Sequence, residues 1–421
     1  MLDIKFIREN VDVVKKGAES KRMTVDIDRL LHLDTEIKPL QQQLEKLLGD
    51  RNRLSKDIGK ASPTDREVLK TAVQDIKGKI DSITEDLRPK KEEFDSLMLF
   101  VPAPPGTGVP IGKDDSENVS VKQWGEVPKF SFAPKDHVAL GERLGIVDIP
   151  RGVKLAGSRS YVLKGEGAIL EQAILRYSYE KLLKKGYTPL SIPVLVKEDA
   201  MIGTGFFPLG REQTYYVEKD ELALVGTAEV SLTSYFSAET LDESDLPIRL
   251  FAQSPCFRRE AGTYGKDTKG LYRVHQFQKI EQVIIARADP EVSKAMHAEI
   301  LGNAEEILQD FGLPYRVVDV CTGDLGQGQI RKNDIETWMP SRNGYGETHS
   351  CSTFHDFQAR RLKLRYRDRT GNLSYCHTLN NTAVAMPRIL IPLLECFQET
   401  DGRVRIPEVL RPYMRGKTHL G

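Results

Sequence analysis

The chain has 421 residues, 39% of them hydrophobic and 29% charged, so it can bury a sizeable core in two or three domains. Lys plus Arg and Asp plus Glu both number 61, so the overall charge does not indicate a nucleic-acid partner, and any basic surface must be local. The five cysteines form no Cys-x-x-Cys pair, and the sequence contains neither an apolar run of bilayer length nor a signal-peptide core. These features argue against a disulfide framework and a membrane span, and we expect a cytoplasmic protein.

The first 100 residues predict a helical domain. Residues 1–25 have the mixed pattern of a short helix and a connector. From residue 30 to residue 97, apolar residues then recur at alternating spacings of three and four, interrupted once by the segment KASPT (60–64). Two such segments joined by a Ser-Pro turn predict an antiparallel coiled-coil hairpin, with an arm roughly 45–50 Å long. Pro39 and Pro89 lie inside the pattern and should bend the helices locally.

The half of this arm that contains the turn is basic. Between Arg51 and Lys79, eight basic residues stand against four acidic residues. A solvated coiled-coil face is the ordinary explanation for such charges. A positive tip on a projecting arm would also suit contact with the phosphates of a nucleic acid.

The segment VPAPPGTGVP (101–110) predicts a linker between the helical domain, residues 1–100, and a second domain, residues 111–421. In the second domain, strand-like runs outnumber helical patterns and follow one another along the chain, which favours an α+β fold with a largely antiparallel sheet flanked by helices. We expect helices over residues 168–185, 227–237, 289–311, 352–362 and 386–398. There is no Walker A loop and no Rossmann fingerprint.

The stretch FRREAGTYGKDTKGLYRVHQFQKIEQ (257–282) predicts two strands joined by a glycine-rich loop. Alternate side chains of a strand share a face. Arg258 and Glu260 therefore share a face of the first strand. One face of the second strand carries Arg273, His275, Phe277, Lys279 and Glu281, and its other face carries Val274, Gln276, Gln278 and Ile280.

A hairpin whose polar face is simply in water would leave Phe277 exposed among charges. A ligand that bears both signs of charge explains the pattern better. Guanidinium groups bind phosphate or carboxylate, an aromatic ring stacks on a purine, and carboxylates accept hydrogen bonds from amino groups. Together these groups suggest a site for ATP and an amino acid.

These residues resemble a known family. FRREAG with RVHQFQKIEQ is similar to the second signature of the class II aminoacyl-tRNA synthetases, YTPLSIPVLV (187–196) to the first and NNTAVAMPRIL (380–390) to the third. More narrowly, GTAEV (226–230), ETHSCS (347–352), HTLNNTA (377–383) and the N-terminal hairpin resemble seryl-tRNA synthetases of the bacterial type. The resemblance covers essentially the whole chain.

The resemblance implies specific roles. Arg258 and Arg388 would be the catalytic residues, binding the α-phosphate and the terminal phosphate of ATP. The implied serine site contains Thr227, Ala228, Glu229, Arg258, Glu281, Asn380 and Thr382, with Arg273 nearby. The implied ATP site contains Arg258, Arg259, Glu260, Val274, Phe277, Glu347, Thr348, His349, Ser350 and Arg388, with Glu347 and Ser350 as ligands of Mg²⁺.

The implied reaction is activation of L-serine to seryl-adenylate and transfer to the 3′ end of serine tRNA, and of selenocysteine tRNA where one is present. The resemblance also implies that the arm binds the long variable arm of the tRNA and that the protein is a homodimer formed near Pro193. Zinc ligation by Cys351 or Cys376 is an alternative that their spacing to neighbouring histidines does not favour, so we expect Mg²⁺ with ATP and no zinc. Two further alternatives are a ligase that charges a carrier protein and an inactive synthetase-like protein that binds nucleic acid.

Overall fold

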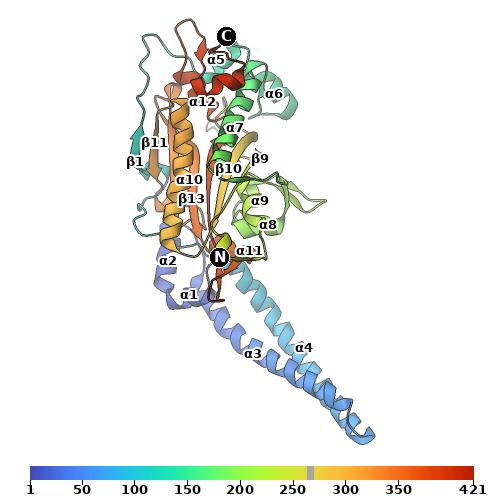
Figure 1. Cartoon of the computed structure of the whole chain (residues 1–421). Helices are drawn as coiled ribbons and strands as arrows, with labels where there is room; N and C mark the ends of the chain where they lie inside the picture. The colour runs from blue at the N-terminus through green and yellow to red at the C-terminus, as the bar shows by residue number, and fades with distance from the viewer. Residues whose placement is uncertain (263–269) are drawn as a thin grey trace. The chain divides into compact units, whose positions relative to one another are not determined.

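The computed structural model describes residues 1–262 and 270–421 (Figure 1). The chain divides into two compact units. One comprises Leu2–Glu19 and Met23–Pro102, and the other comprises Met1, Ser20–Arg22 and Ala103–Gly421. Within the described residues, no helix is long and apolar enough to cross a membrane.

The first unit is helical and contains α1 (Ile4–Glu9), α2 (Val11–Ser20), α3 (Ile27–Ile58) and α4 (Pro63–Phe100). The predicted helical hairpin is confirmed: α3 and α4 pack along the apolar seam, where Leu33, Ile37 and Leu87 are buried. Ser62 caps α4 by accepting from the backbone N–H of Asp65. Both long helices continue through their internal prolines, and residues 1–25 form two short helices instead of one.

The second unit is built on an eight-stranded sheet of order β1-β11-β12-β13-β16-β10-β9-β4. Every neighbouring pair is antiparallel except β4 with β9, so the expected largely antiparallel sheet is confirmed. The strands are β1 (Val119–Trp124), β4 (Thr188–Pro189), β9 (Ile248–Phe257), β10 (Gln276–Ala286), β11 (Tyr315–Asp319), β12 (Arg331–Met339), β13 (Gly344–His355) and β16 (His377–Ala385).

Smaller elements surround the sheet. The helices are α5 (His137–Arg143), α6 (Ile149–Ala156), α7 (Glu166–Lys184), α8 (Glu198–Thr204), α9 (Glu229–Ser234), α10 (Pro290–Phe311), α11 (Phe357–Leu362) and α12 (Leu390–Cys396). The short strands are β2 (Val147–Asp148), β3 (Val162–Leu163), β5 (Leu195–Lys197), β6 (Tyr216–Val217), β7 (Leu222–Leu224), β8 (Thr240–Asp242), β14 (Arg365–Arg367), β15 (Leu373–Tyr375), β17 (Val404–Arg405) and β18 (His419–Leu420).

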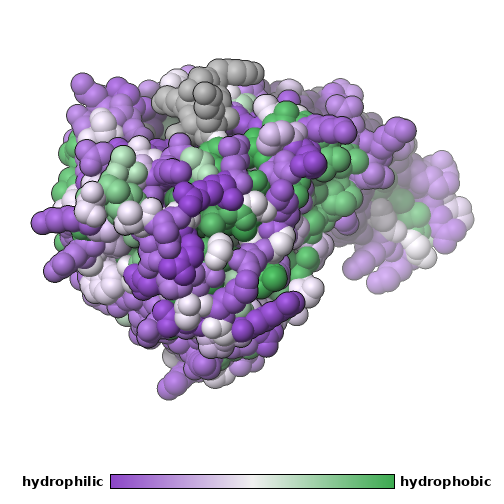
Figure 2. Space-filling model, turned by 90° about the horizontal axis from the view of Figure 1, so that it is seen from above, coloured by the Kyte–Doolittle hydropathy of each residue, from purple (hydrophilic) through white to green (hydrophobic). Residues whose placement is uncertain are grey.

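The two faces of the sheet differ in character. Helices α7 and α10 run along one face and bury it in the main apolar core, where Ile174 and Ile307 meet Ile280 and Ile284 of β10 (Figure 1). Gln282, on the same face of β10, donates to the carbonyl of Ile300 in α10. Since side chains alternate along a strand, Lys279 and Glu281 lie on the opposite face. The face of the molecule seen in Figure 2 is mostly hydrophilic, with smaller hydrophobic areas between.

Each helix predicted in the second domain has a counterpart, but α9 and α12 are shorter than the predicted ranges 227–237 and 386–398. The helix expected over residues 168–185 is α7, followed by Gly186 with φ +81°. The helix expected over residues 352–362 is wrong in its first part, because residues 352–355 end strand β13 and α11 begins at Phe357. The glycine-rich loop expected after Arg258 includes residues 263–269, which lie outside the described residues.

Candidate active site

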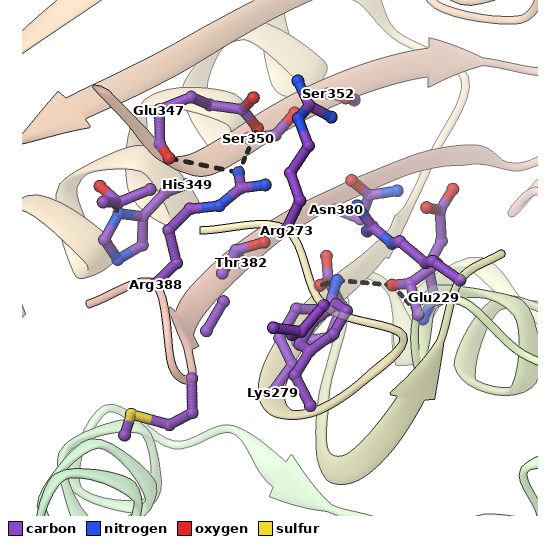
Figure 3. Close-up of a pocket in the computed structure, with 18 of the residues that line it drawn as sticks. Glu229, Arg273, Lys279, Glu347, His349, Ser350, Ser352, Asn380, Thr382 and Arg388 are labelled. Atoms are coloured by element: carbon purple, nitrogen blue, oxygen red, sulfur yellow. Dashed lines mark hydrogen bonds and ion pairs between the residues drawn. The ribbon is translucent and has the colours of Figure 1, made fainter. Parts of the chain in front are cut away.

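The sheet face opposite α7 and α10 forms one wall of a cavity of about 290 Å³ (Figure 3). Its lining comes from strands β10, β12, β13 and β16, from the segments that follow β9, precede β10 and follow β16, and from the start of α9 and the segments that follow α8 and precede α9 and β12. All but two of the residues that the sequence predicts for the site line it: Thr227, Glu229, Arg258, Glu260, Val274, Phe277, Glu281, Glu347, Thr348, His349, Ser350, Asn380, Thr382 and Arg388.

Ala228 and Arg259 are the two that do not line the cavity. Ala228 is fully buried in an apolar cluster with Leu232 and Leu250. The backbone N–H of Arg259 donates to the carbonyl of Gln213 at 3.0 Å. Neither residue is part of the lining of this cavity.

The hairpin β9–β10 carries the floor of the cavity. Phe277 lies opposite Cys256 of β9, and Phe277, Lys279 and Glu281 share the cavity face, as the alternation predicts. Two expectations are corrected. Val274 lines the cavity although it was expected on the other face, and His275 does not line it, because regular strand geometry begins only at Gln276.

Each of the two predicted catalytic arginines stacks on an aromatic ring. The guanidinium carbon of Arg258 lies 5.3 Å from the ring centre of Phe277, and that of Arg388 lies 4.6 Å from the ring centre of Tyr272. Arg388 also pairs with Glu347, with Nη1 3.4 Å from Oε1 (Figure 3). Burial alone would lower the pKa of Arg388, but the charges of Glu347, Tyr272, Glu260 and Asp334 together outweigh burial and raise the pKa.

A polar group of four residues, Thr227, Glu229, Lys279 and Glu281, lies in the same cavity; we call it the acid cluster. Lys279 donates to Thr227 Oγ1 at 2.7 Å and pairs with Glu281. Glu229 accepts from Gln358 Nε2 at 2.8 Å, and burial together with the charge of Glu281 raises the pKa of Glu229 to about 7. Two carboxylates and a hydroxyl in one cavity suit a small ligand that carries an ammonium group and a hydroxyl.

Glu347 and Ser350, three positions apart on β13, both line the cavity (Figure 3). Burial would raise the pKa of Glu347, but Arg388 and Lys332 lower it overall, so the carboxylate is ionised at neutral pH. Burial lowers the pKa of the neighbouring His349 to about 4. An ionised carboxylate and a hydroxyl are ligands that suit Mg²⁺.

The cysteines offer a different chemistry. All five are free and buried, and burial raises the pKa of Cys351 well above its usual value and that of Cys376 to about 12. Zinc binds the thiolate form, which such pKa values disfavour. Within residues 1–262 and 270–421, no group of three or more His, Cys, Asp and Glu side chains is arranged to hold a metal ion.

Comparison with known proteins assigns the chain to a family. Residues 1–105 match the seryl-tRNA synthetase N-terminal domain, and residues 214–397 match the tRNA synthetase class II core domain (G, H, P, S and T). The chain is 46% identical to the serine–tRNA ligase of Deinococcus radiodurans, covering 100% of this chain and 99% of the relative. It is 44% identical to that of Rubrobacter xylanophilus, again covering 100% and 99%. The chain belongs to the seryl-tRNA synthetase family.

Solved structures agree with this assignment. A structure of the seryl-tRNA synthetase from Pyrococcus horikoshii complexed with ATP aligns with a TM-score of 0.89 at 38% identity. The alignment covers 100% of this chain and 99% of the Pyrococcus chain. The cytoplasmic serine–tRNA ligase of Naegleria fowleri, in complex with AMP, aligns with a TM-score of 0.85 at 28% identity, covering 100% and 98%. The predicted class II fold with an N-terminal helical arm is confirmed.

Sequence reasoning gave no role to several residues that the seryl-tRNA synthetase fold brings into the cavity. The cavity is also lined by Tyr272, Gln329, Lys332 and Ser352. Lys279 was expected on this face without a role, and it links Thr227 to Glu281. Lys332 and Ser352 lie in strands that the sequence pattern did not predict, because β12 and β13 carry many polar side chains at buried positions. The alternation of Lys332 with Asp334 is the signal that could have identified β12.

Proposed function

We propose that the protein is a serine–tRNA ligase that activates L-serine with ATP to seryl-adenylate and then transfers the seryl group to the 3′ end of serine tRNA. Selenocysteine tRNA, where a cell contains one, would be charged in the same way. The observation that carries this proposal is the cavity itself, in which two stacked guanidinium groups adjoin the acid cluster. The names of relatives that match the full chain point to the same reaction.

The ATP half of the cavity is formed by its aromatic and cationic residues. Phe277 offers a ring face on which adenine stacks, with the guanidinium of Arg388 on the other side of the base. Glu260 and the backbone near Val274 recognise the amino group of adenine. Arg258 binds the α-phosphate and Arg388 binds the terminal phosphate, and Thr348 and His349 add wall contacts. Arg259 and Ala228 would act through their backbone.

The acid cluster forms the serine half. Glu229 and Glu281 bind the ammonium group and the hydroxyl of serine, with Thr227, Asn380 and Thr382 around them. Glu229 is only 8% exposed, so a ligand that lacks the hydroxyl would leave buried polar atoms unpaired. A site of this kind can reject alanine by a factor of about 10⁴.

The chemistry is an in-line attack of the serine carboxylate on the α-phosphate, with pyrophosphate leaving. Arg258 holds the two reacting groups together and stabilises the charge that develops between them. Mg²⁺ bound with ATP would be held by Glu347 and Ser350, and it supplies charge neutralisation of the phosphates. The terminal ribose hydroxyl of the tRNA then attacks the adenylate, which needs neither a protein nucleophile nor a strong general base.

The arm supplies the contact with tRNA. The basic residues between Arg53 and Lys79 are exposed on α3 and α4, where they can reach the backbone of the long variable arm of serine tRNA. We further propose a homodimer formed near Pro193, in line with the family, and a cytoplasmic location, which the five free thiols support.

The test is pyrophosphate exchange into ATP with each of the twenty amino acids and without tRNA. We expect exchange with serine alone. Exchange with a different amino acid would overturn the assignment of the acid cluster, and a folded protein without exchange would favour an inactive, RNA-binding protein.

A further inference from the structure

The proposed function gives no role to Lys332, one of the cations that line the cavity. Lys332 lies on β12 opposite Ser352 of β13, which in turn lies opposite Asn380 of β16. Its side chain is 15% exposed and lines the cavity, and its Nζ lies 2.9 Å from Oδ2 of Asp334. Lys332 therefore occupies the β12 side of the cavity, whereas Phe277 and the acid cluster lie on the β10 side.

Lys332 differs from the other lining cations that form ion pairs in how its charge is paired. Lys279 pairs with Glu281, Arg273 with Glu260, and Arg388 with Glu347, so in each of these pairs both partners line the cavity. Asp334, the partner of Lys332, is 4% exposed and is not part of the lining. The ammonium group is thus the part of this ion pair that faces the cavity.

The surroundings of Lys332 fix both its charge and its position. Burial would lower the pKa of Lys332, but the charges of Asp334, Glu347 and Asp324 outweigh burial and raise the pKa, so the ammonium form persists throughout the neutral range. Asp334 lies opposite Ser350 in the β12–β13 pairing, and the charge of Glu347 acts on Lys332, so the ion pair lies on the side of the cavity that carries Ser350 and Glu347.

We propose that the ammonium group of Lys332 binds the polyphosphate of ATP, and the pyrophosphate it releases, beside the Glu347–Ser350 site. The inference rests on the proposed function. ATP brings about four negative charges to the part of the cavity where Glu347 already adds one, and the cation of Lys332 would offset some of that charge together with Arg258 and Arg388. Stability alone does not explain the pair, because a buried ion pair adds little net stability compared with apolar side chains of similar volume.

The experiment compares ligands that differ only in their phosphates. Equilibrium dissociation constants of ATP, AMP and inorganic pyrophosphate are measured by calorimetry for the wild type, Lys332→Met and Lys332→Arg, with Mg²⁺ and with EDTA. The control is Lys181→Met, because Lys181 is 18% exposed and pairs with Asp310 on the opposite face of the sheet. A charged hydrogen bond is worth about 1.5–3 kcal/mol, so we expect Lys332→Met to weaken ATP and pyrophosphate at least about tenfold in both buffers. The dissociation constant of AMP should change less than about twofold. Lys332→Arg should keep most of the affinity for ATP and pyrophosphate, and the control variant should bind all three ligands like the wild type.

A second variant separates phosphate contact from the structural pair. Lys332→Met leaves Asp334 buried and uncompensated, and Lys332→Met/Asp334→Asn removes both charges. The selective loss of ATP affinity should persist in the double variant. Equal loss of AMP and ATP, no loss of either, or full recovery in the double variant would each overturn the inference. A failure of the serine assignment would appear separately, as pyrophosphate exchange with another amino acid. It would leave intact the difference between the effects of Lys332→Met on the affinities for ATP and AMP. A wild type that binds neither ATP nor pyrophosphate would overturn both proposals.

Discussion

Glu229 should make the catalytic unit less stable as the pH rises through neutrality. Burial and the nearby charge of Glu281 raise the pKa of Glu229 from its usual 4.5 to about 7. A carboxyl whose pKa is higher in the folded state binds its proton more tightly there, so its favourable contribution is complete below pH 4.5 and is lost as the pH rises through 7. Glu229→Gln keeps the acceptor for Gln358 Nε2 but cannot ionise.

The size of the effect follows from the change in pKa. A rise from 4.5 to about 7 is roughly 2.5 pH units, which corresponds to about 3 kcal/mol at 1.36 kcal/mol per unit. At pH 5 the wild type and Glu229→Gln should therefore have similar free energies of unfolding. At pH 8 the variant should be more stable by up to about 3 kcal/mol, less whatever the amide loses in hydrogen bonding.

Urea denaturation followed by tryptophan fluorescence measures this directly. The two tryptophans, Trp124 and Trp338, both lie in the catalytic unit, so the signal does not report the helical arm. Glu218→Gln, at an exposed carboxylate, is the control and should follow the wild type at every pH. Serine should stabilise the wild type more at pH 8 than at pH 6, because its ammonium group binds the ionised form of Glu229. A Glu229→Gln protein with the same pH dependence as the wild type would refute the reasoning.

Three further predictions concern other parts of the molecule. Glu281→Ala should lower the free energy of unfolding by about 3–5 kcal/mol, because Lys279, whose side chain is 6% exposed, loses the carboxylate it pairs with. In urea denaturation, adding Lys279→Met should recover most of that loss, and no recovery would argue against the ion pair. His137→Ala should raise KM for ATP several-fold in pyrophosphate exchange and leave KM for serine unchanged. His137 Nε2 accepts a hydrogen bond from the backbone N–H of Leu271, which begins the segment that carries Arg273 and Val274 into the cavity, so its loss should displace that segment. Deleting residues 30–97 should abolish tRNA charging and spare exchange without tRNA; loss of both activities would mean that the arm supports the fold.

The sequence by itself determined the features that depend on local pattern. The three-four spacing of apolar residues predicted the helical hairpin, because residues at that spacing line one side of a helix whatever else the chain does. The period of two in residues 277–281 correctly placed Phe277, Lys279 and Glu281 on one face. Short motifs at Arg258 and Arg388 indicated the family and with it the chemistry of the cavity.

Only the tertiary structure decided which of these groups meet. Lys332 reaches the cavity because β12 pairs with β13 in one register, and Gln358 reaches Glu229 across 129 positions of the chain. Strands β12 and β13 escaped prediction because many of their buried side chains are polar and find partners on other elements, which hides the alternation of apolar and polar residues. The charges of Glu229 and Lys332 are likewise set by burial and by neighbours that the fold supplies, since desolvation and Coulomb interactions depend on distance in space and not along the chain.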